Sequence, residues 1–174
     1  MAKGENTRSG MLWEVERLLK ECGDNLPQML LMENVPEVVG SKNIKFFAEW
    51  LSFLDSLGYT SKWQILNAKD FGIPQNRERC FCISIKSSNH YYYFPSKRKL
   101  THKLSSVLQT EVSKEYYLPD KLIDYYFQRT EVCKANGNGF KFAPTPPRKT
   151  SYAKTITTRE GYRLCDNYLY DEDT

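Results

Sequence analysis

Residues 29–35, MLLMENV, form an apolar run that ends with a carboxylate and a carboxamide side by side, Glu33 and Asn34, shortly before Pro36. A short apolar run bounded by a proline is typical of a strand that is buried on both faces, and proline cannot continue the hydrogen-bonded ladder. Glu33 and Asn34 are therefore expected where the strand ends. Ligands bind at the carboxyl ends of the strands in an open α/β sheet, so the sequence predicts a site here.

The segments around this run alternate between helical and strand-like periodicity. We expect two helices and three strands, over residues 10–22, 28–33, 43–57, 60–68 and 79–85. Ser9 suits the N-cap of the first helix, and Gly23 and Gly58 follow the ends of the two helices. The order helix, strand, helix, strand, strand is typical of an α/β domain, but it has too few strands for a complete doubly wound sheet.

A second polar stretch, NAKDFGIPQNRER at residues 67–79, lies between the last two expected strands. A glycine and a proline fix a turn, after which Gln75, Arg77 and Arg79 alternate in an extended segment and so project to the same side. Two guanidinium groups on one face repel each other unless anions or carboxylates lie between them. The segment is therefore either a site for anionic groups or a pair of surface arginines that bridge to acidic neighbours.

Positive charge is concentrated in the second half of the chain. Residues 1–85 hold 10 Lys/Arg against 11 Asp/Glu, whereas residues 86–165 hold 15 against 6. The same half contains most of the tyrosines and a proline-rich run, FAPTPPRKTSYAKTITTR, which cannot form a long helix. Basic residues interleaved with aromatic residues suit a polyanion such as nucleic acid. The alternative is a solvated basic face with half-buried tyrosines.

Composition excludes several other classes of protein. The chain has 174 residues, of which 40% are hydrophobic, so it can bury a core, and its apolar stretches are too short to span a membrane. The amino terminus has no hydrophobic segment that could act as a secretory signal, so we expect a cytoplasmic location. The five cysteines form no C-x-x-C pair and there are two histidines, so we expect no metal and reduced thiols that pack as small residues.

Together these stretches resemble the cytosine-5 DNA methyltransferases. MENV is similar to the E-N-V motif of that family, NAKDFGIPQNRERCFCISI to its Q-x-R-x-R motif, and TRSGMLWEVERLL to the short motif that precedes E-N-V. The resemblance implies a partial Rossmann-like, S-adenosylmethionine-dependent methyltransferase sheet of the α/β class over residues 1–86. It implies a small, irregular and mostly β target-recognition lobe over residues 87–174.

The resemblance also implies a mechanism. In this family the target cytosine is flipped out of the duplex, a cysteine thiolate adds to ring carbon 6, and carbon 5 takes a methyl group from S-adenosylmethionine. Glu33 is similar to the residue whose carboxyl group bonds ring nitrogen 3 and the exocyclic amine. Asn34 would brace the loop around the nucleophile, and Arg79 would contact the flipped base or orient Glu33. Gln75 and Arg77 would bind the DNA backbone or position neighbouring loops.

Two further parts of the site are implied in the same way. Met11 falls where the family places an apolar residue against the adenine of the cofactor. SYAKTITTR is similar to segments that contact double-stranded DNA, which implies DNA contacts from Lys154, Thr155, Thr157, Thr158 and Arg159. The F-x-G-x-G cofactor loop and the catalytic Pro-Cys of the family are absent from this sequence. We therefore expect an internal piece that is inactive alone, either one part of a split methyltransferase or a non-catalytic DNA-binding remnant.

The last expectation concerns association. Half of a doubly wound sheet leaves an edge strand, expected at residues 28–33, whose backbone groups and apolar side chains are suited to being covered. The second helix adds an apolar stripe that half a sheet cannot fully bury, at Phe46, Phe47, Trp50, Phe53 and Leu54. We expect a homodimer that pairs the exposed edges. The alternative is a monomer whose helices repack over the edge.

Overall fold

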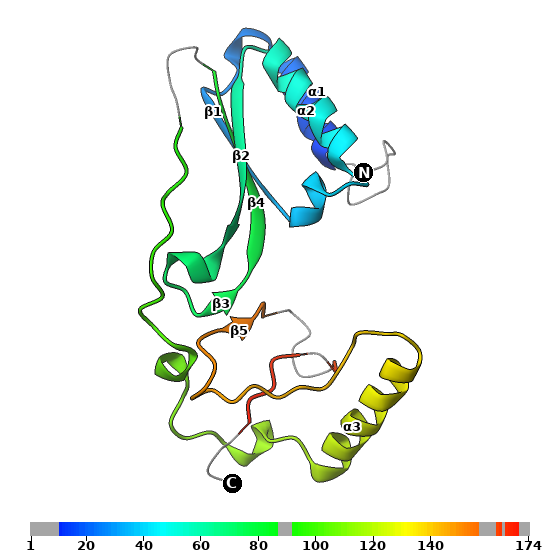
Figure 1. Ribbon diagram of the computed structural model, residues 1–174. Coiled ribbons are helices and arrows are strands. Elements are labelled where there is room, and N and C mark those ends of the chain that lie inside the picture. The colour runs from blue at the N-terminus through cyan, green and yellow to red at the C-terminus, as the bar shows by residue number, and fades with distance from the viewer. Residues whose placement is uncertain (1–10, 87–91, 157–162, 165, 171–174) are drawn as a thin grey trace. The chain divides into compact units, whose positions relative to one another are not determined.

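The computed structural model describes residues 11–86, 92–156, 163–164 and 166–170 (Figure 1). The chain forms two compact units. The first contains Met1–Leu66 and Glu78–Ser96, and the second contains Asn67–Arg77 and Lys97–Thr174. The chain therefore passes from one unit to the other three times, and residues 67–77 belong with the second half of the sequence. The functional boundary expected at residue 86 stays a prediction.

The first unit is built on a three-stranded sheet with two helices on one of its faces (Figure 1). Its helices and strands are α1 (Met11–Glu21), β1 (Met29–Asn34), α2 (Ile44–Ser56), β2 (Thr60–Asn67) and β4 (Glu78–Ile85). The strand order is β1-β4-β2. The predicted order of helices and strands is confirmed. No helix in the part of the chain that the structure describes is long and apolar enough to cross a membrane.

β1 is an edge strand with one covered face. It pairs antiparallel with β4 and has no strand on its other side among the described residues. Leu30 and Met32 pack against the core, but Met29 and Leu31 are 60% and 65% exposed. The prediction of a strand buried on both faces is therefore wrong for this chain. Successive side chains of a strand point to opposite faces, so the apolar run places side chains on both faces of β1. The helices α1 and α2 cover only one of these faces.

The backbone groups of β1 divide into two sets. In an antiparallel ladder, residue pairs that exchange hydrogen bonds alternate with pairs that do not. The amide of Lys86 donates to the carbonyl of Gln28 at 2.9 Å, and the register then runs along β1 without a bulge. The amides and carbonyls of Met29, Leu31 and Glu33 therefore point away from β4, toward the free edge of the sheet.

The core of the first unit lies between the helices and one face of β4. The buried residues of this core are Leu19, Val38, Phe47, Trp50, Leu54, Tyr59, Cys80 and Cys82. The predicted alternation along β4 holds in part: Cys80, Cys82 and Ser84 are all buried, whereas on the other face Phe81 and Ile85 are half-buried and Ile83 is also buried. The expectation that the α2 stripe stays uncovered is wrong for Phe47, Trp50 and Leu54. The small side chains of β4 leave room for these large ones against the sheet.

The second unit is irregular. Its helix and strands are β3 (Gln75–Asn76), α3 (Asp120–Ala135) and β5 (Ala153–Lys154), and β3 pairs parallel with β5. Short 3-10 turns at Ala68–Phe71, Leu104–Val107 and Lys114–Tyr116 join them. In the first unit, similar turns lie at Gly23–Asn25 and Pro36–Val39. The lobe is irregular as expected, but its longest element is a 16-residue helix, so the described residues contain less β structure than we predicted.

Aromatic rings form the core of this unit around α3. The ring of Tyr126 lies 5.3 Å from that of Phe142 and 5.7 Å from that of Tyr168. Thr130 of α3 also accepts a hydrogen bond from the amide of Phe142 at 2.8 Å, which ties the following segment to the helix. Gly137, with a φ of 69°, allows the chain to leave the helix in the left-handed conformation.

Candidate active site

Glu33 and Arg79 meet at the end of β1. Glu33 is the fifth residue of β1 and Arg79 the second of β4, and the two strands pair antiparallel. Arg79 Nε lies 2.9 Å from Glu33 Oε1, and Arg79 Nη1 donates to the carbonyl of Glu78 at 2.7 Å. The Glu33 side chain is 48% exposed and the Arg79 side chain 21%. The guanidinium is thus fixed by two acceptors, and it holds a carboxylate that solvent or a ligand can still reach.

Asn34 shapes the turn that follows Glu33. Its side-chain Oδ1 accepts a hydrogen bond from the amide of Val35 at 2.8 Å, where the strand gives way to the 3-10 turn at Pro36–Val39. Asparagine commonly stabilises turns through local bonds of this kind. Asn34 therefore lies beside Glu33 as predicted, and the bracing of a nucleophile loop stays a prediction.

Gln75 and Arg77 belong to the second unit, whereas Arg79 belongs to the first. The extended segment that we expected over these residues is interrupted. β3 ends at Asn76, and the amide of Arg77 donates to the carbonyl of Gln75 at 3.1 Å, which bends the chain before β4 begins at Glu78. The structure therefore brings Arg79 to Glu33. Gln75 and Arg77 lie in the second unit, where β3 pairs with β5.

Asn67 is a structural residue of this region that sequence reasoning missed. It is 6% exposed, and its Nδ2 donates to Asn76 Oδ1 at 2.7 Å. Its Oδ1 accepts from the amides of Arg77 and Lys69 at 3.1 and 3.3 Å. The signal was a polar residue at the end of an apolar strand, directly before a turn. Such a residue satisfies backbone donors that no strand can pair.

The predicted DNA-contacting residues are described in part. Lys154 is exposed, and its amide donates to Asn167 Oδ1 at 2.8 Å. Thr155 is half-buried, and its hydroxyl donates to the carbonyl of Asn76 at 2.9 Å. The remaining predicted contacts, Thr157, Thr158 and Arg159, lie outside the described residues. The side chain of Met11, which the resemblance places against the cofactor, also lies outside them.

The paired Glu33 and Arg79 come from the two motifs that suggested a methyltransferase, and a comparison of whole sequences supports the same assignment. Residues 2–172 match the family model described as C-5 cytosine-specific DNA methylase. The chain belongs to this family. Because the match covers nearly the whole sequence, the second unit is part of the methylase and not an unrelated domain.

Curated relatives are considerably longer than this methylase chain. The type II methyltransferase M2.ScrFI of Lactococcus lactis subsp. cremoris is 45% identical over 117 residues, which are 67% of this chain and 32% of the relative. The orphan methyltransferase M.SssI of Spiroplasma monobiae is 39% identical over 139 residues, 79% of this chain and 35% of the relative. The chain thus spans about a third of the length of these two proteins.

Solved structures show that the fold is that of a methyltransferase. The crystal structure of the S. pombe Dnmt2 methyltransferase matches with a TM-score of 0.68 and 18% identity, over 96% of this chain and 51% of the other. A Spodoptera frugiperda DNMT2 variant matches with a TM-score of 0.65 and 15% identity, over 97% and 48%. The predicted α/β methyltransferase class is confirmed, and at this identity the likeness concerns the fold alone.

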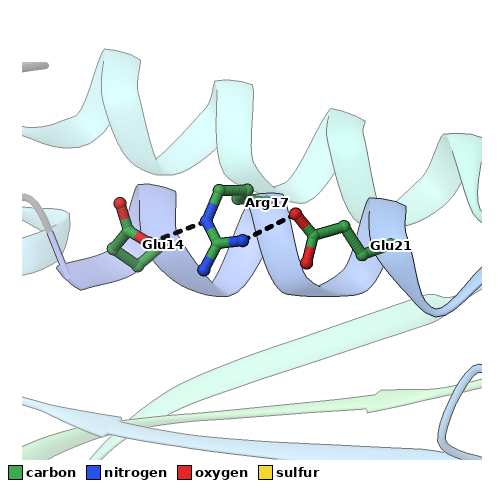
Figure 2. A network of polar contacts seen from close by, with 3 residues as sticks. All are labelled: Glu14, Arg17 and Glu21. Atoms are coloured by element: carbon green, nitrogen blue, oxygen red, sulfur yellow. Dashed lines mark hydrogen bonds and ion pairs between the residues drawn. The ribbon is translucent and has the colours of Figure 1, made fainter.

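A second polar network of the chain lies on α1 and involves none of the site residues described above. Arg17 donates through Nε to Glu14 at 2.9 Å and through Nη1 to Glu21 at 2.6 Å (Figure 2). The hydrogen bonds to these two carboxylates raise the pKa of the Arg17 guanidinium, and the bond to Glu14 has the larger effect. All three side chains are exposed, so water screens the network and it supports the helix only weakly.

A metal or cofactor site requires a particular set of donor groups. The described residues include no cluster of three or more His, Cys, Asp or Glu side chains that could bind a metal ion. The glycine loop that would let the backbone approach S-adenosylmethionine is absent from the sequence. The side chains that are described therefore supply the Glu33–Arg79 pair and do not fit a cofactor site.

Proposed function

We propose that this chain supplies the Glu33–Arg79 part of the active site of a DNA (cytosine-5) methyltransferase. The substrate is a cytosine flipped out of double-stranded DNA, the methyl donor is S-adenosylmethionine, and the enzyme works in the cytoplasm. The observation that carries the proposal is the 2.9 Å Arg79–Glu33 ion pair at the end of β1, in a member of the cytosine-5 DNA methylase family. Type II methyltransferases among the relatives support a restriction-modification setting.

Glu33 stabilises charge on the cytosine ring. One oxygen of its carboxyl group donates a proton to ring nitrogen 3, where electron density collects when a nucleophile adds to carbon 6, and the other oxygen accepts a hydrogen bond from the exocyclic amine. Arg79 holds the carboxyl group in one orientation while leaving about half of its surface open to the incoming base. This arrangement is pre-organised, because the orientation is set before the base arrives.

The nucleophile and the cofactor loop come from a portion of the enzyme that this sequence does not contain. Two observations support this part of the proposal: the chain spans about a third of the length of two relatives, and β1 has a free edge. The edge carries the outward backbone groups of Met29, Leu31 and Glu33, with the exposed side chains of Met29 and Leu31 beside them. An added strand binds to an edge of this kind through main-chain hydrogen bonds.

Complementation tests the proposal. The purified chain is mixed with a methyltransferase fragment that carries F-x-G-x-G and Pro-Cys, and transfer of radiolabelled methyl groups to duplex DNA is measured. We expect no transfer by the chain alone and transfer by the mixture. The control is the same fragment with its catalytic cysteine changed to serine. Transfer by the isolated chain, or a silent mixture in which the two parts demonstrably bind each other, would contradict the proposal.

A second candidate function is a DNA-binding module without catalysis. The excess of 15 basic over 6 acidic residues in 86–165 favours it, and so does the exposed Lys154 on β5. This candidate predicts DNA binding by the isolated chain and no gain of activity with any complementing fragment. The complementation experiment therefore separates the two functions.

A further inference from the structure

A long-range hydrogen bond joins residues 153–155, called the recognition segment here, to the turn at residues 75–77. The Thr155 hydroxyl donates to the carbonyl of Asn76 at 2.9 Å, across 79 positions of sequence. Beside it, the amide of Ala153 donates to the carbonyl of Pro74 at 2.9 Å. These bonds accompany the parallel pairing of β3 with β5, so residues 153–155 lie along residues 74–76 within the second unit.

The same turn is held from its other side by Asn67. The Asn67 amide group donates to the Asn76 side chain at 2.7 Å, and its oxygen accepts from the amide of Arg77 at 3.1 Å. The carbonyl of Arg77 in turn accepts from the amide of Ala68 at 3.0 Å. Asn76 is thus bonded through its side chain to Asn67 and through its carbonyl to Thr155.

Strands of two residues are short, so side-chain bonds carry a large share of this pairing. β3 and β5 each contain two residues, and few backbone hydrogen bonds can form between them. The Thr155 hydroxyl adds a bond at the point where β5 ends. Only Glu78 separates Arg77 from Arg79, the partner of Glu33.

We propose that Thr155 is a positioning residue whose hydroxyl fastens the recognition segment to the Gln75–Arg77 turn. Its role differs from the direct DNA contact that the sequence resemblance implies for it. The hydroxyl, together with Asn67, sets the backbone of Asn76 and Arg77 before DNA binds. The role in DNA recognition rests on the proposed function, whereas the fastening is a property of the free chain.

Amide hydrogen exchange of the DNA-free chain, followed by NMR, tests the fastening. Thr155→Val removes the hydroxyl and keeps the shape, and Thr155→Ser keeps the hydroxyl. We expect exchange at the amides of Ala153 and Arg77 to become at least several-fold faster in the valine variant and to stay near wild type in the serine variant. The matched control is Thr110→Val, at an exposed threonine of the same unit.

Two results would overturn the inference. One is unchanged exchange at Ala153 and Arg77 in Thr155→Val. The other is an equal rise in exchange throughout α3, because that would mean a general loosening of the unit. Asn67→Ala provides an independent approach from the other side of the turn, and we expect faster exchange at Arg77 and Lys69. If Thr155→Val does not fold, Thr155→Ala, which also removes the hydroxyl, decides, and unchanged exchange at Ala153 and Arg77 in it contradicts the fastening.

DNA binding separates positioning from contact. Fluorescence anisotropy with a labelled duplex should show several-fold weaker binding by Thr155→Val, with the slope of log affinity against log salt unchanged, because no cation is lost. Weaker binding together with unchanged exchange in the free chain would assign Thr155 to direct DNA contact and overturn the proposal. If the wild-type chain binds no DNA, the proposed function fails in its DNA part, while the exchange data still decide the fastening.

Discussion

Arg79 orients the Glu33 carboxylate without burying it. An ion pair that is as open to water as this one contributes about 0–1 kcal/mol to folding, so its value to the fold is small. Its value to chemistry is larger, since a carboxylate held in one direction needs no rearrangement when charge develops on a bound base. Substitutions in this pair are therefore expected to change the proposed activity much more than the stability of the fold.

Glu33→Gln should lower methyl transfer by the complemented enzyme by roughly 10²–10³-fold, because a neutral amide stabilises charge on the ring less well. The same change should leave the melting temperature of the chain nearly unaltered. Glu37→Gln, on the adjacent exposed turn, is the control and should keep full activity. Both are measured by radiolabelled methyl transfer and thermal melting. Full activity of Glu33→Gln would remove the carboxylate from the mechanism.

The buried thiols of β4 make stability depend on pH. Burial, with a smaller effect of Cys82, raises the pKa of Cys80 from 9.0 to about 11, and burial also raises the pKa of Cys82. The folded state therefore favours the neutral thiols. This contribution to stability is fully present below pH 9 and is lost as the pH rises through about 11.

Denaturant titrations at a series of pH values should show this loss, and Cys80→Ala should flatten it between pH 9 and 11. At pH 8, a thiol-reactive reagent should modify the half-buried Cys22 and Cys133 well before Cys80 and Cys82. Equal rates for Cys22, Cys133, Cys80 and Cys82 would show that β4 opens readily, contrary to the packing of these four described cysteines.

At the scale of elements, periodicity predicts what a segment forms and not what covers it. α2, β2 and β4 agree with their sequence patterns, and the extent of burial along β1 does not, because it depends on the neighbours of the sheet. The sequence does contain boundary signals for α3, namely Pro119–Asp120 at its start and Gly137 after its end. β3 and β5 had none, since two-residue strands depend on partners far away in the sequence.

The candidate site divides in the same way. The family resemblance already gave orientation of Glu33 as one of two roles for Arg79, and the β1–β4 register is what brings the two side chains within hydrogen-bonding distance. The position of Asn67 at a strand end before a turn was a usable signal, but its bond partners and the proposed fastening role of Thr155 could not be predicted, because each depends on a turn whose shape is set by several bonds at once. Tertiary contacts of this kind leave no periodic trace in a sequence.

The free edge of β1 makes a sharp prediction about association. Leu31→Pro removes an amide that points toward the edge and leaves the bonds between β1 and β4 intact, whereas Leu30→Pro removes one of those bonds. We propose that two copies pair through this edge. Light scattering across a tenfold dilution should then give a dimer mass for the wild type and a monomer mass for a folded Leu31→Pro chain.

Adding the complementing fragment should dissociate this dimer, because both partners use the same edge. Leu30→Pro is the control for damage to the sheet and should unfold the first unit, as read by circular dichroism. A monomeric wild type at every concentration, with slow amide exchange at Leu31, would rule the dimer out.

At the scale of the whole molecule, the positive charge and the proposed catalytic pair lie on different parts of the chain. The Glu33–Arg79 pair belongs to the first unit, whereas Lys154 and all but one of the 15 basic residues in 86–165 belong to the second. If the second unit binds DNA, its affinity should fall steeply with salt. Lys154→Glu should lower the slope of log affinity against log salt by about 1, as expected for one lost phosphate contact.

Lys42→Glu makes the same change of charge in the first unit and is the control. Both variants are compared by anisotropy with a labelled duplex at several salt concentrations. If Lys154→Glu and Lys42→Glu weaken binding equally, the basic half is a solvated surface and the contact is nonspecific.

The three passages of the chain between its units limit how this protein can be recombined. A crossover after residue 86, the obvious seam in the sequence, would give the new chain a foreign lobe but keep the old residues 67–77. β3 and β5 would then come from different parent proteins, and the bonds that Ala153 and Thr155 make to residues 74–76 would depend on the new residues at positions 153 and 155. A recombinant that keeps the bonds of the second unit therefore has to take residues 67–77 and 97–174 from the same parent, although β4 lies between them in the sequence.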